Sequence, residues 1–331
     1  MSAVETTPAR SRRRRRTAVI SAISAGVLAV GTVGVLSQLD ASAAESGPVG
    51  FASLNGGTTG GSTSTTVTVS TAAALKTAIS SSTSQTVKVS GLITIAGMYP
   101  VASNKTIIGV GAASGVTGGG FTLSAVKNVV IRNLVFKNSS DDAINVQSGT
   151  TNVWIDHNDL STAYDGLIDI KRGSDFVTVS WNHLHNHNKS MLLGHSDTNG
   201  AQDTGHLRVT YVHNWFDGTN QRHPRVRFGN PVHVLNNYYS NIGAYGVGSA
   251  MGAGVYVERN YFENVAKPTM TTVGDSPEPG NLKVFRNYKV NSGTEQTRNP
   301  SSVGAIPYSY TPQAAGKVKA TVMAGAGTGK I

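Results

Sequence analysis

Short runs in which β-branched and aromatic residues alternate with polar residues return along the middle of the chain. A period of two predicts strands, and the Gly, Asn, Ser and Asp residues between the runs are typical of turns. The runs follow one another too closely for a repeated helix to lie between them. The strand pattern is carried by VVIRNLVF, VWIDHNDL, VTVSWNHL, VTYVHNWF, VHVLNNYY, VYVERNYF and LKVFRNYK, which begin at Val129, Val153, Val177, Val209, Val232, Val255 and Leu282.

Aligning these segments predicts one column of asparagines, separated by 25, 24, 32, 23, 23 and 27 residues: Asn133, Asn158, Asn182, Asn214, Asn237, Asn260 and Asn287. Repeats of this length indicate a solenoid, since a propeller blade needs about 40 residues. A side-chain amide both donates and accepts, so copies stacked about 4.8 Å apart form a ladder. The sequence therefore predicts an all-β fold, a parallel β-helix with an asparagine ladder.

The two ends of the predicted solenoid have different patterns. A Gly/Ser/Thr-rich stretch covers residues 56–70, and TAAALKTAIS (Thr71–Ser80) predicts a short helix with Thr71 as its cap. We expect this helix to cover the open end of the solenoid, where strand edges would otherwise be unpaired. After Asn291 the tail contains three prolines and is expected to wrap the outside: Pro300, Pro307 and Pro312.

The first residues have the layout of an export signal. A basic run, Arg12 to Arg16, precedes small and apolar residues from Thr17 to Leu36, and Ala41-Ser42-Ala43 then provides an A-x-A site. A membrane anchor is the alternative, but the cleavage site favours removal of residues 1–43. We expect a secreted, extracellular protein without a membrane attachment after removal, in which residues 44–331 form a single domain with a flexible start over 44–66. The general and twin-arginine routes both remain open.

The net charge limits the classes of molecule that the protein could bind, and the cysteine content bears on how the fold is held together. The segment 1–43 holds six arginines and two acids, so its removal lowers the formal net charge from +10 to +6. A basic surface suits a polyanion, and the lack of a lysine-rich patch interleaved with aromatics argues against nucleic acid. The chain has no cysteine, so its core must hold the exported fold together without disulfides. An anionic polysaccharide and an acidic lipid surface both remain open as partners at this point, and we expect a monomer.

Acidic residues gather in one window of the chain: Asp141, Asp142, Asp156, Asp159, Asp165 and Asp169. Asp165 and Asp169 share the parity of one strand, with Gly166 available for a bend, and Asp142 lies 23 residues earlier, about one coil. Carboxylates on adjacent coils repel one another, and Ca²⁺ would relieve that repulsion. Solvated turn acids are the alternative. No cysteine cluster or H-E-x-x-H pattern supports zinc or iron.

Basic residues gather in the stretch QRHPRVRFGN, Gln221 to Asn230. In a strand that begins near Pro224, Arg225 and Arg227 point to one face and Val226 and Phe228 to the other. Arg222 precedes the proline and is free to lean over the neighbouring coil, and Lys189 lies in the long insertion before it. Several arginines a coil or two beyond several aspartates, on the same side, favour a cleft that binds an acidic chain through Ca²⁺ and guanidinium groups; a solubilising outer face is the alternative.

Several longer motifs occur in a specific order: NVVIRNLVF, NVWIDHNDL, YDGLIDIKRGSDFVTVSWNHL, NKSMLLGH and RHPRVRFGNPVHVLNNYY. With these motifs the sequence resembles the pectate lyases of polysaccharide lyase family 1, from about Val67 to the final AGAGTGKI. The resemblance implies a right-handed parallel β-helix, secretion, and endo-acting cleavage of polygalacturonate by Ca²⁺-dependent β-elimination.

The resemblance also assigns roles to single residues. It implies Arg222 as the base, Lys189 and Arg227 as substrate-binding residues, and a Ca²⁺ site made of Asp142, Asp165 and Asp169. A further acid that some members use two residues before Asp142 is Ser140 here, with Asp141 next to it, so the number of ions stays open.

Other residues of the motifs receive no catalytic role. We interpret His157 and Trp154 as structural. Arg225 has no assigned role, and a surface salt bridge is one interpretation of it.

Three other activities are compatible with parts of this pattern. A pectin lyase acts on methyl esters without metal, and Asp165, Asp169 and Lys189 argue against it because an uncharged ester needs neither Ca²⁺ nor lysine. A hydrolase on the same fold needs two carboxylic acids flanking the bond. A non-catalytic polysaccharide-binding module would keep the cleft without turnover.

Overall fold

The computed structural model describes residues 47–331, which belong to the second of two compact units, Leu39–Ile331. The predicted export signal, residues 1–43, lies outside the described residues. Among the helices of residues 47–331, none has the length and apolar character needed to cross a membrane.

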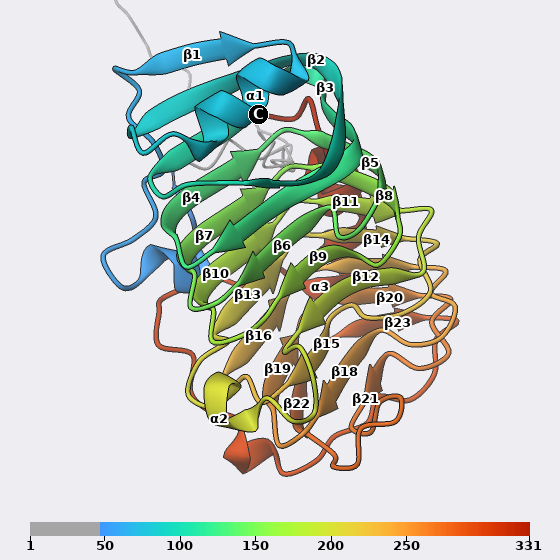
Figure 1. Cartoon of the computed structure of the whole chain (residues 1–331). Coiled ribbons are helices and arrows are strands. Elements are labelled where there is room, and N and C mark those ends of the chain that lie inside the picture. The colour runs from blue at the N-terminus through green and yellow to red at the C-terminus, as the bar shows by residue number, and fades with distance from the viewer. Residues whose placement is uncertain (1–46) are drawn as a thin grey trace, which may run out of the picture. The chain divides into compact units, whose positions relative to one another are not determined.

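The described chain is a parallel β-helix built from three stacks of strands (Figure 1). Stack one contains β6 Ile144–Gln147, β9 Gly166–Ile170, β12 Lys189–Leu193, β15 Arg225–Arg227, β18 Val247–Ala250 and β21 Thr269–Met270. Stack two contains β4 Lys127–Arg132, β7 Thr151–Asp156, β10 Asp175–Ser180, β13 Val209–Val212, β16 Val232–Leu235, β19 Gly254–Glu258 and β22 Asn281–Phe285. Stack three contains β5 Val135–Ser139, β8 Asp159–Ala163, β11 His183–His185, β14 Trp215–Asp217, β17 Tyr238–Ser240, β20 Tyr261–Glu263 and β23 Tyr288–Val290.

The core lies inside the three stacks, where alternate side chains of each strand meet those of the coils on either side. In stack two the register places Ile131 opposite Ile155, and Ile155 opposite Val179. All three side chains are fully buried. Burying each such side chain contributes about 1.5–3 kcal/mol, so the repeated Val/Ile pattern of the sequence supplies most of what holds one coil to the next.

The N-terminal end carries longer strands and a helix. Strand β1 (Thr66–Val69) pairs with β2 (Gln85–Pro100), which pairs with β3 (Lys105–Ser124). Helix α1 (Ala72–Ser80) lies at this end (Figure 1). Thr71 Oγ1 accepts a hydrogen bond of 3.3 Å from Ala74 N, which is the N-cap that the sequence predicted. Leu75 and Ile79 of the helix are fully buried in the core.

The segment that we predicted as a flexible start packs on the outside of stack two. It contains the 3-10 helix η1 (Gly50–Ser53), in which Phe51 and Ala52 are fully buried. Ala52 N donates to Thr178 Oγ1 at 3.1 Å. A second contact follows at Gly60 N, which donates to Asn128 Oδ1 at 2.8 Å. A Cβ on Gly60 would lie 2.1 Å from Thr106 Oγ1 and one on Gly61 would lie 1.8 Å from Gln85 O, so these two glycines allow the segment to approach the strands closely.

Stacked asparagines connect the coils at the turn between stacks two and three. Their Nδ2 groups donate to the Oδ1 of the next copy at 2.9–3.1 Å, through Asn158, Asn182, Asn214, Asn237, Asn260 and Asn287. The residue before each of them has a positive φ, which turns the chain sharply: His157, Trp181, His213, Asn236, Arg259 and Arg286.

The prediction is wrong for Asn133. The register pairs Val129 with Val153 and Arg132 with Asp156, which puts Asn133 opposite His157 and leaves Leu134 opposite Asn158. Asn133 itself has a φ of 54° and donates to Gly109 O and Gly111 O, so it occupies the turn position before the column. Our alignment had shifted this first segment by one residue.

Removal of one ladder amide should destabilise the protein strongly. Asn237 accepts from both Asn214 N and Asn214 Nδ2 and donates to Tyr211 O, all in the buried interior. Asn237→Ala leaves these groups unpaired, so we expect the free energy of unfolding in urea to fall by roughly 3 kcal/mol or more. The exposed Asn220, whose side chain donates to Asn188, is the matched control, and N220A should cost less than about 1 kcal/mol. Equal losses in the two variants would contradict a structural role for burial of the ladder.

The tail wraps the outside, as predicted, but it contains structure that we did not predict. Besides η2 (Pro300–Ser302) it forms α3 (Ala315–Gly325), whose Val318 and Val322 pack against Tyr238. The chain then returns toward the N-terminal coils, where Thr328 Oγ1 donates to Ala112 O. A further short helix, α2 (Gly200–Asp203), lies in the long insertion after β12.

Candidate active site

The three acids predicted as metal ligands come together on stack one. Asp169 lies in β9, Asp165 directly precedes that strand, and Asp142 lies two residues before β6. Each offers a carboxylate oxygen, and these oxygens all lie within 4.8 Å of one another. Asp142 Oδ1 accepts from Gly166 N at 2.9 Å, which ties Asp142 to the start of β9. The chain bends at Tyr164 and Asp165, just before the strand, and not at Gly166 as we predicted.

Burial and mutual repulsion disfavour the ionised form of two of these carboxylates, Asp169 and Asp142. Burial, and then the charge of Asp142, raise the pKa of Asp169 to about 8. Burial also raises the pKa of Asp142, against the opposing charge of Lys171. For the more exposed Asp165 burial acts in the same direction, but hydrogen bonding and charge from Lys189 outweigh it and lower the pKa. The carboxylates of this group therefore repel one another, and a bound cation would offset that repulsion.

The acidic group fits a hard divalent cation. Asp169 Oδ1 is buried and has no hydrogen-bond partner within residues 47–331. A Cβ on Gly166 would lie 2.1 Å from that same oxygen, so only glycine keeps the space above it open. Oxygen donors from three carboxylates are the ligands that Ca²⁺ prefers. The acids would hold this ion through Asp142, Asp165 and Asp169; Asp141 is exposed and outside the group.

Lys171 belongs to this site, and we did not predict it. Its Nζ lies 3.1 Å from Asp142 Oδ2 and 3.8 Å from Asp169 Oδ2. The signal was present in the run GLIDIK, because Lys171 shares the strand parity of Asp169. Its ammonium group balances part of the negative charge between the two buried acids.

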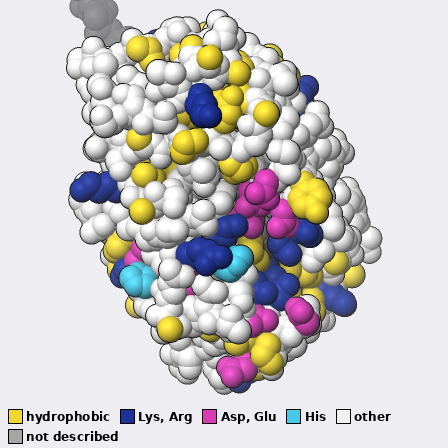
Figure 2. All heavy atoms as spheres, in the orientation of Figure 1, with side chains coloured by type: hydrophobic (Ala, Val, Ile, Leu, Met, Phe, Trp, Pro, Cys, Tyr) yellow, Lys and Arg dark blue, Asp and Glu magenta, His cyan; other side chains and the backbone are white. Residues whose placement is uncertain are grey.

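The predicted base and one predicted substrate-binding residue lie against the acids. Lys189 Nζ donates to Asp165 Oδ1 at 2.8 Å, and Arg222 Nη1 lies 3.8 Å from the same oxygen. The buried Arg222 Nε has no hydrogen-bond partner in the described chain. Figure 2 shows acidic and basic side chains side by side on the face over β6, β9, β12 and β15. Stacking thus brings residues from four successive coils to one place.

The other two arginines point outward from β15, as predicted, and both are held by the surrounding loops. Arg227 pairs with Asp197 and donates to Gly194 O at 3.2 Å. Arg225 is buried and donates to Ser276 Oγ at 2.9 Å, so the contact with Asp275 at 3.5 Å is only part of its environment and the surface interpretation is too simple. Phe228 does not continue the strand, because its φ of 61° turns the chain after Arg227. Asp197 lies in the insertion, where no repeat pattern indicated a role.

His157 and Trp154 are both buried away from the acidic group, in agreement with a structural role. His157 Nδ1 lies 2.7 Å from Asp156 Oδ2, and Trp154 Nε1 donates to Ser180 Oγ at 2.9 Å. Asp156 also pairs with Arg132 at 2.7 Å. This acid from the original window thus satisfies a buried polar network.

Two buried histidines, His223 and His213, should make the stability of the fold depend on pH. His223 is fully buried between Thr219 Oγ1 and Tyr245 O, and burial lowers the pKa of His223 to about 4. Burial likewise lowers the pKa of His213 to about 4. Between pH 6.5 and about 4 the unfolded chain binds protons that the folded chain excludes. Each histidine should therefore lower stability by about 1.4 kcal/mol per pH unit as the pH falls.

Urea unfolding at pH 7, 6 and 5 measures this effect, and His223→Gln isolates one contribution. The variant should lose about half of the combined slope from the two histidines, because glutamine keeps a hydrogen-bond donor but does not titrate. His206→Gln, at an exposed site, is the control. A slope in H223Q identical to that of the original protein would contradict the assignment.

Comparisons with known proteins agree with this geometry. A family model described as pectate lyase matches residues 16–331. A pectate trisaccharide-lyase from Bacillus licheniformis is 36% identical over 334 residues, covering 95% of this chain and 94% of the relative. Pectate lyase A from Aspergillus niger is 42% identical over 289 residues, covering 84% and 86%. A crystal structure of a pectate lyase from Bacillus sp. N165 with trigalacturonate has a TM-score of 0.78 at 34% identity, covering 86% of this chain and 99% of that one.

The parallel β-helix, with acids and guanidinium groups meeting on one stack, together with these relatives, defines a polysaccharide lyase. Within that class, the chain belongs to the pectate lyase family.

Proposed function

We propose that the protein is a secreted, endo-acting pectate lyase that cleaves polygalacturonate by Ca²⁺-dependent β-elimination. The observation that carries the proposal is the meeting of two incomplete groups: the acids around Asp169 Oδ1, and the guanidinium of Arg222 with its unpaired Nε. They share Asp165, which Arg222 approaches to 3.8 Å. A cation held by the acids, together with the carboxylate of an acidic sugar beside Arg222, would complete both.

In the proposed reaction the neutral guanidine form of Arg222 accepts the proton from C5 of a galacturonate unit. The electron pair forms the C4–C5 double bond, the C4–O bond to the next sugar breaks, and the leaving oxygen takes a proton from water. Arg222 then returns its proton to the solvent. Lys189 and Arg227 bind uronate carboxylates and favour the negative charge that develops beside C5. When bound, Ca²⁺ supplies further positive charge at that carboxylate.

Endo action is supported by the place of the site along the solenoid. It lies on β9, β12 and β15, and stack one continues on both sides of it, through β6 and through β18 and β21. A long substrate can therefore extend past the site in both directions. Secretion is supported by the export-signal pattern of residues 1–43.

Product analysis tests the proposal. Polygalacturonate incubated with the protein and Ca²⁺ should give ultraviolet-absorbing unsaturated oligomers whose masses include no added water. Early products should have a range of lengths. Saturated products with one added water per cut would indicate a hydrolase, faster turnover of methyl-esterified pectin in a chelator would indicate a pectin lyase, and trisaccharides alone from the outset would contradict endo action.

A further inference from the structure

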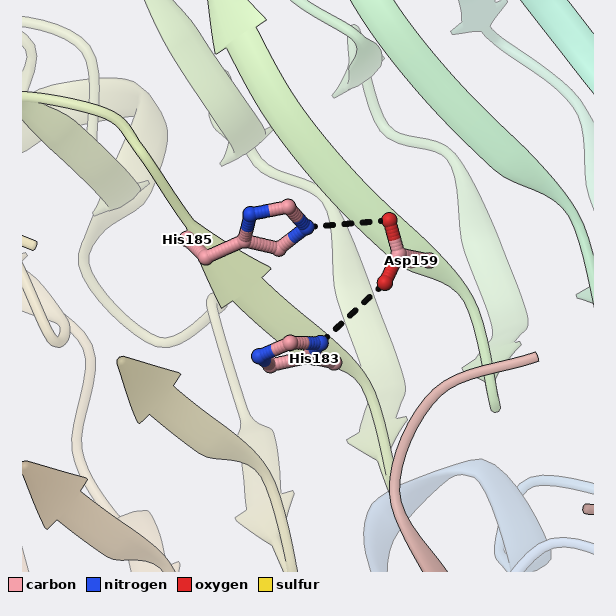
Figure 3. Close-up of side chains that lie close together, drawn as sticks. All are labelled: Asp159, His183 and His185. Atoms are coloured by element: carbon pink, nitrogen blue, oxygen red, sulfur yellow. Dashed lines mark hydrogen bonds and ion pairs between the residues drawn. The ribbon is translucent and has the colours of Figure 1, made fainter. Parts of the chain in front are cut away.

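A second group of metal-ligating side chains lies on stack three, away from the strands that carry the acidic group. Asp159 of β8 faces two histidines of β11, the next coil (Figure 3). His183 Nδ1 lies 3.1 Å from Asp159 Oδ2, and His185 Nε2 lies 3.0 Å from Asp159 Oδ1. One ligand atom from each of the three residues lies within 4.8 Å of the other two.

We propose that Asp159, His183 and His185 form a binding site for a divalent transition-metal ion of the Zn²⁺ class. His183 Nδ1, His185 Nε2 and a carboxylate oxygen of Asp159 are the three protein ligands, and a water molecule completes the coordination. Two imidazoles with one carboxylate suit Zn²⁺, Ni²⁺ or Co²⁺, whereas Ca²⁺ prefers oxygen ligands alone. The two metal sites are therefore expected to select different ions.

A fourth residue orients one of the ligands. His183 Nε2 lies 3.3 Å from Asp217 Oδ2, on the opposite side of the ring from Asp159. A carboxylate that accepts the second ring N–H of a metal-bound histidine fixes its tautomer and ring orientation. Asp217 comes from β14, one coil further on, so the arrangement spans three coils. The contact between His183 and Asp217 therefore supports a metal site separately from the distances among the three ligands.

Charge and access also suit an ion. Burial alone would raise the pKa of Asp159, but hydrogen bonds from His183 and His185 outweigh it and hold that pKa well below its usual range, so the ligand is anionic. The side chains of Asp159, His183 and His185 are 26%, 19% and 23% exposed, which leaves a path for an ion from solvent. An ion here would connect β8 directly to β11 and so stabilise the coils.

The same contacts are also consistent with a plain network of histidine–aspartate ion pairs, and exposed pairs of this kind contribute little. The two interpretations differ in their response to added metal. A network without an ion gains nothing from Zn²⁺, whereas a site that binds only in the folded state raises the melting temperature with Zn²⁺ concentration.

Zn²⁺ titration by calorimetry tests the site, using the full chain without a polyhistidine tag and with excess Ca²⁺ to occupy the acidic group. We expect one Zn²⁺ per chain, at least tenfold weaker binding in D159N and H185A, and about 10- to 100-fold weaker binding in D217N, which removes only the orienting carboxylate. His206→Ala removes an exposed histidine elsewhere and should bind as the original protein does.

A second readout protects the test against variants that fold poorly. The Trp215 ring stacks on His183 at 4.3 Å between centroids, so bound Co²⁺ should quench its fluorescence, and W215F should lose that change. Zn²⁺ should also raise the melting temperature of the original protein but not of H185A, while lyase activity in Ca²⁺ stays unchanged in both. Equal Zn²⁺ binding by the original protein, D159N and H185A, or no binding by any of them, would overturn the proposal.

Discussion

Replacing Arg222 by lysine is expected to lower kcat on polygalacturonate by roughly 10³-fold while KM changes by less than about threefold. A lysine keeps one positive charge near Asp165 but cannot place a guanidinium nitrogen at the proton on C5. Binding, which Lys189 and Arg227 also support, is therefore largely retained. Initial rates of ultraviolet absorbance in saturating Ca²⁺ measure the effect.

The control for this variant is Arg286→Lys, because Arg286 is exposed and follows β22 of stack two, whereas β15 belongs to stack one. R286K should retain the original kcat. If R222K also turned over at the original rate, Arg222 would be a substrate-binding residue at most, and the base would have to be sought elsewhere in the site.

Removing Ca²⁺ with a chelator should lower the rate at least 100-fold, and adding it back should restore the rate. The charge that develops on the uronate carboxylate is the barrier, and losing a divalent cation beside it costs several kcal/mol of transition-state stabilisation. Asp169→Asn should have the same effect at moderate Ca²⁺ concentrations. Because Asp169 is buried and repelled by Asp142, the isosteric amide should not lower the melting temperature measured without Ca²⁺.

Calorimetric titration with Ca²⁺ separates the role of Asp169 from that of its surroundings. D169N should bind Ca²⁺ far more weakly than the original protein, whereas Asp141→Asn, one residue from the ligand Asp142 but exposed, should bind nearly as well. Full activity of the original protein in a strong chelator would remove Ca²⁺ from the account and revive the metal-free alternative.

The sequence predicted the parts of this molecule that repeat. A coil of the solenoid forms because the same alternating pattern returns, so the strands and the meeting of Asp142 with Asp165 followed from spacing alone. The bend that we predicted at Gly166 is wrong, because Gly166 is the first residue of strand β9 and the chain bends at Tyr164 and Asp165, just before the strand. Residues tens of positions apart became neighbours because each coil returns to the same three stacks.

The features that sequence missed are those that depend on register or on loops. The sequence alignment places Asn133 in the ladder column, although it lies one position before that column. The error arises because asparagine suits both the left-handed turn position and the ladder position. Asp197 pairs with Arg227, but it lies in an insertion that does not follow the repeat. Helix α3 packs against Tyr238, and the sequence of the helix does not indicate this partner. The pairing of Asp159 with His183 needed the register of β8 on β11, which a search for metal motifs along the chain does not find.

The most direct test of the account is a crystal structure of R222K soaked with Ca²⁺ and trigalacturonate. We predict an ion bonded to Asp142, Asp165 and Asp169 and to a uronate carboxylate, with C5 of that same sugar facing position 222. A trisaccharide bound on another stack, or a sugar in this groove with no ion between it and the acids, would contradict the account.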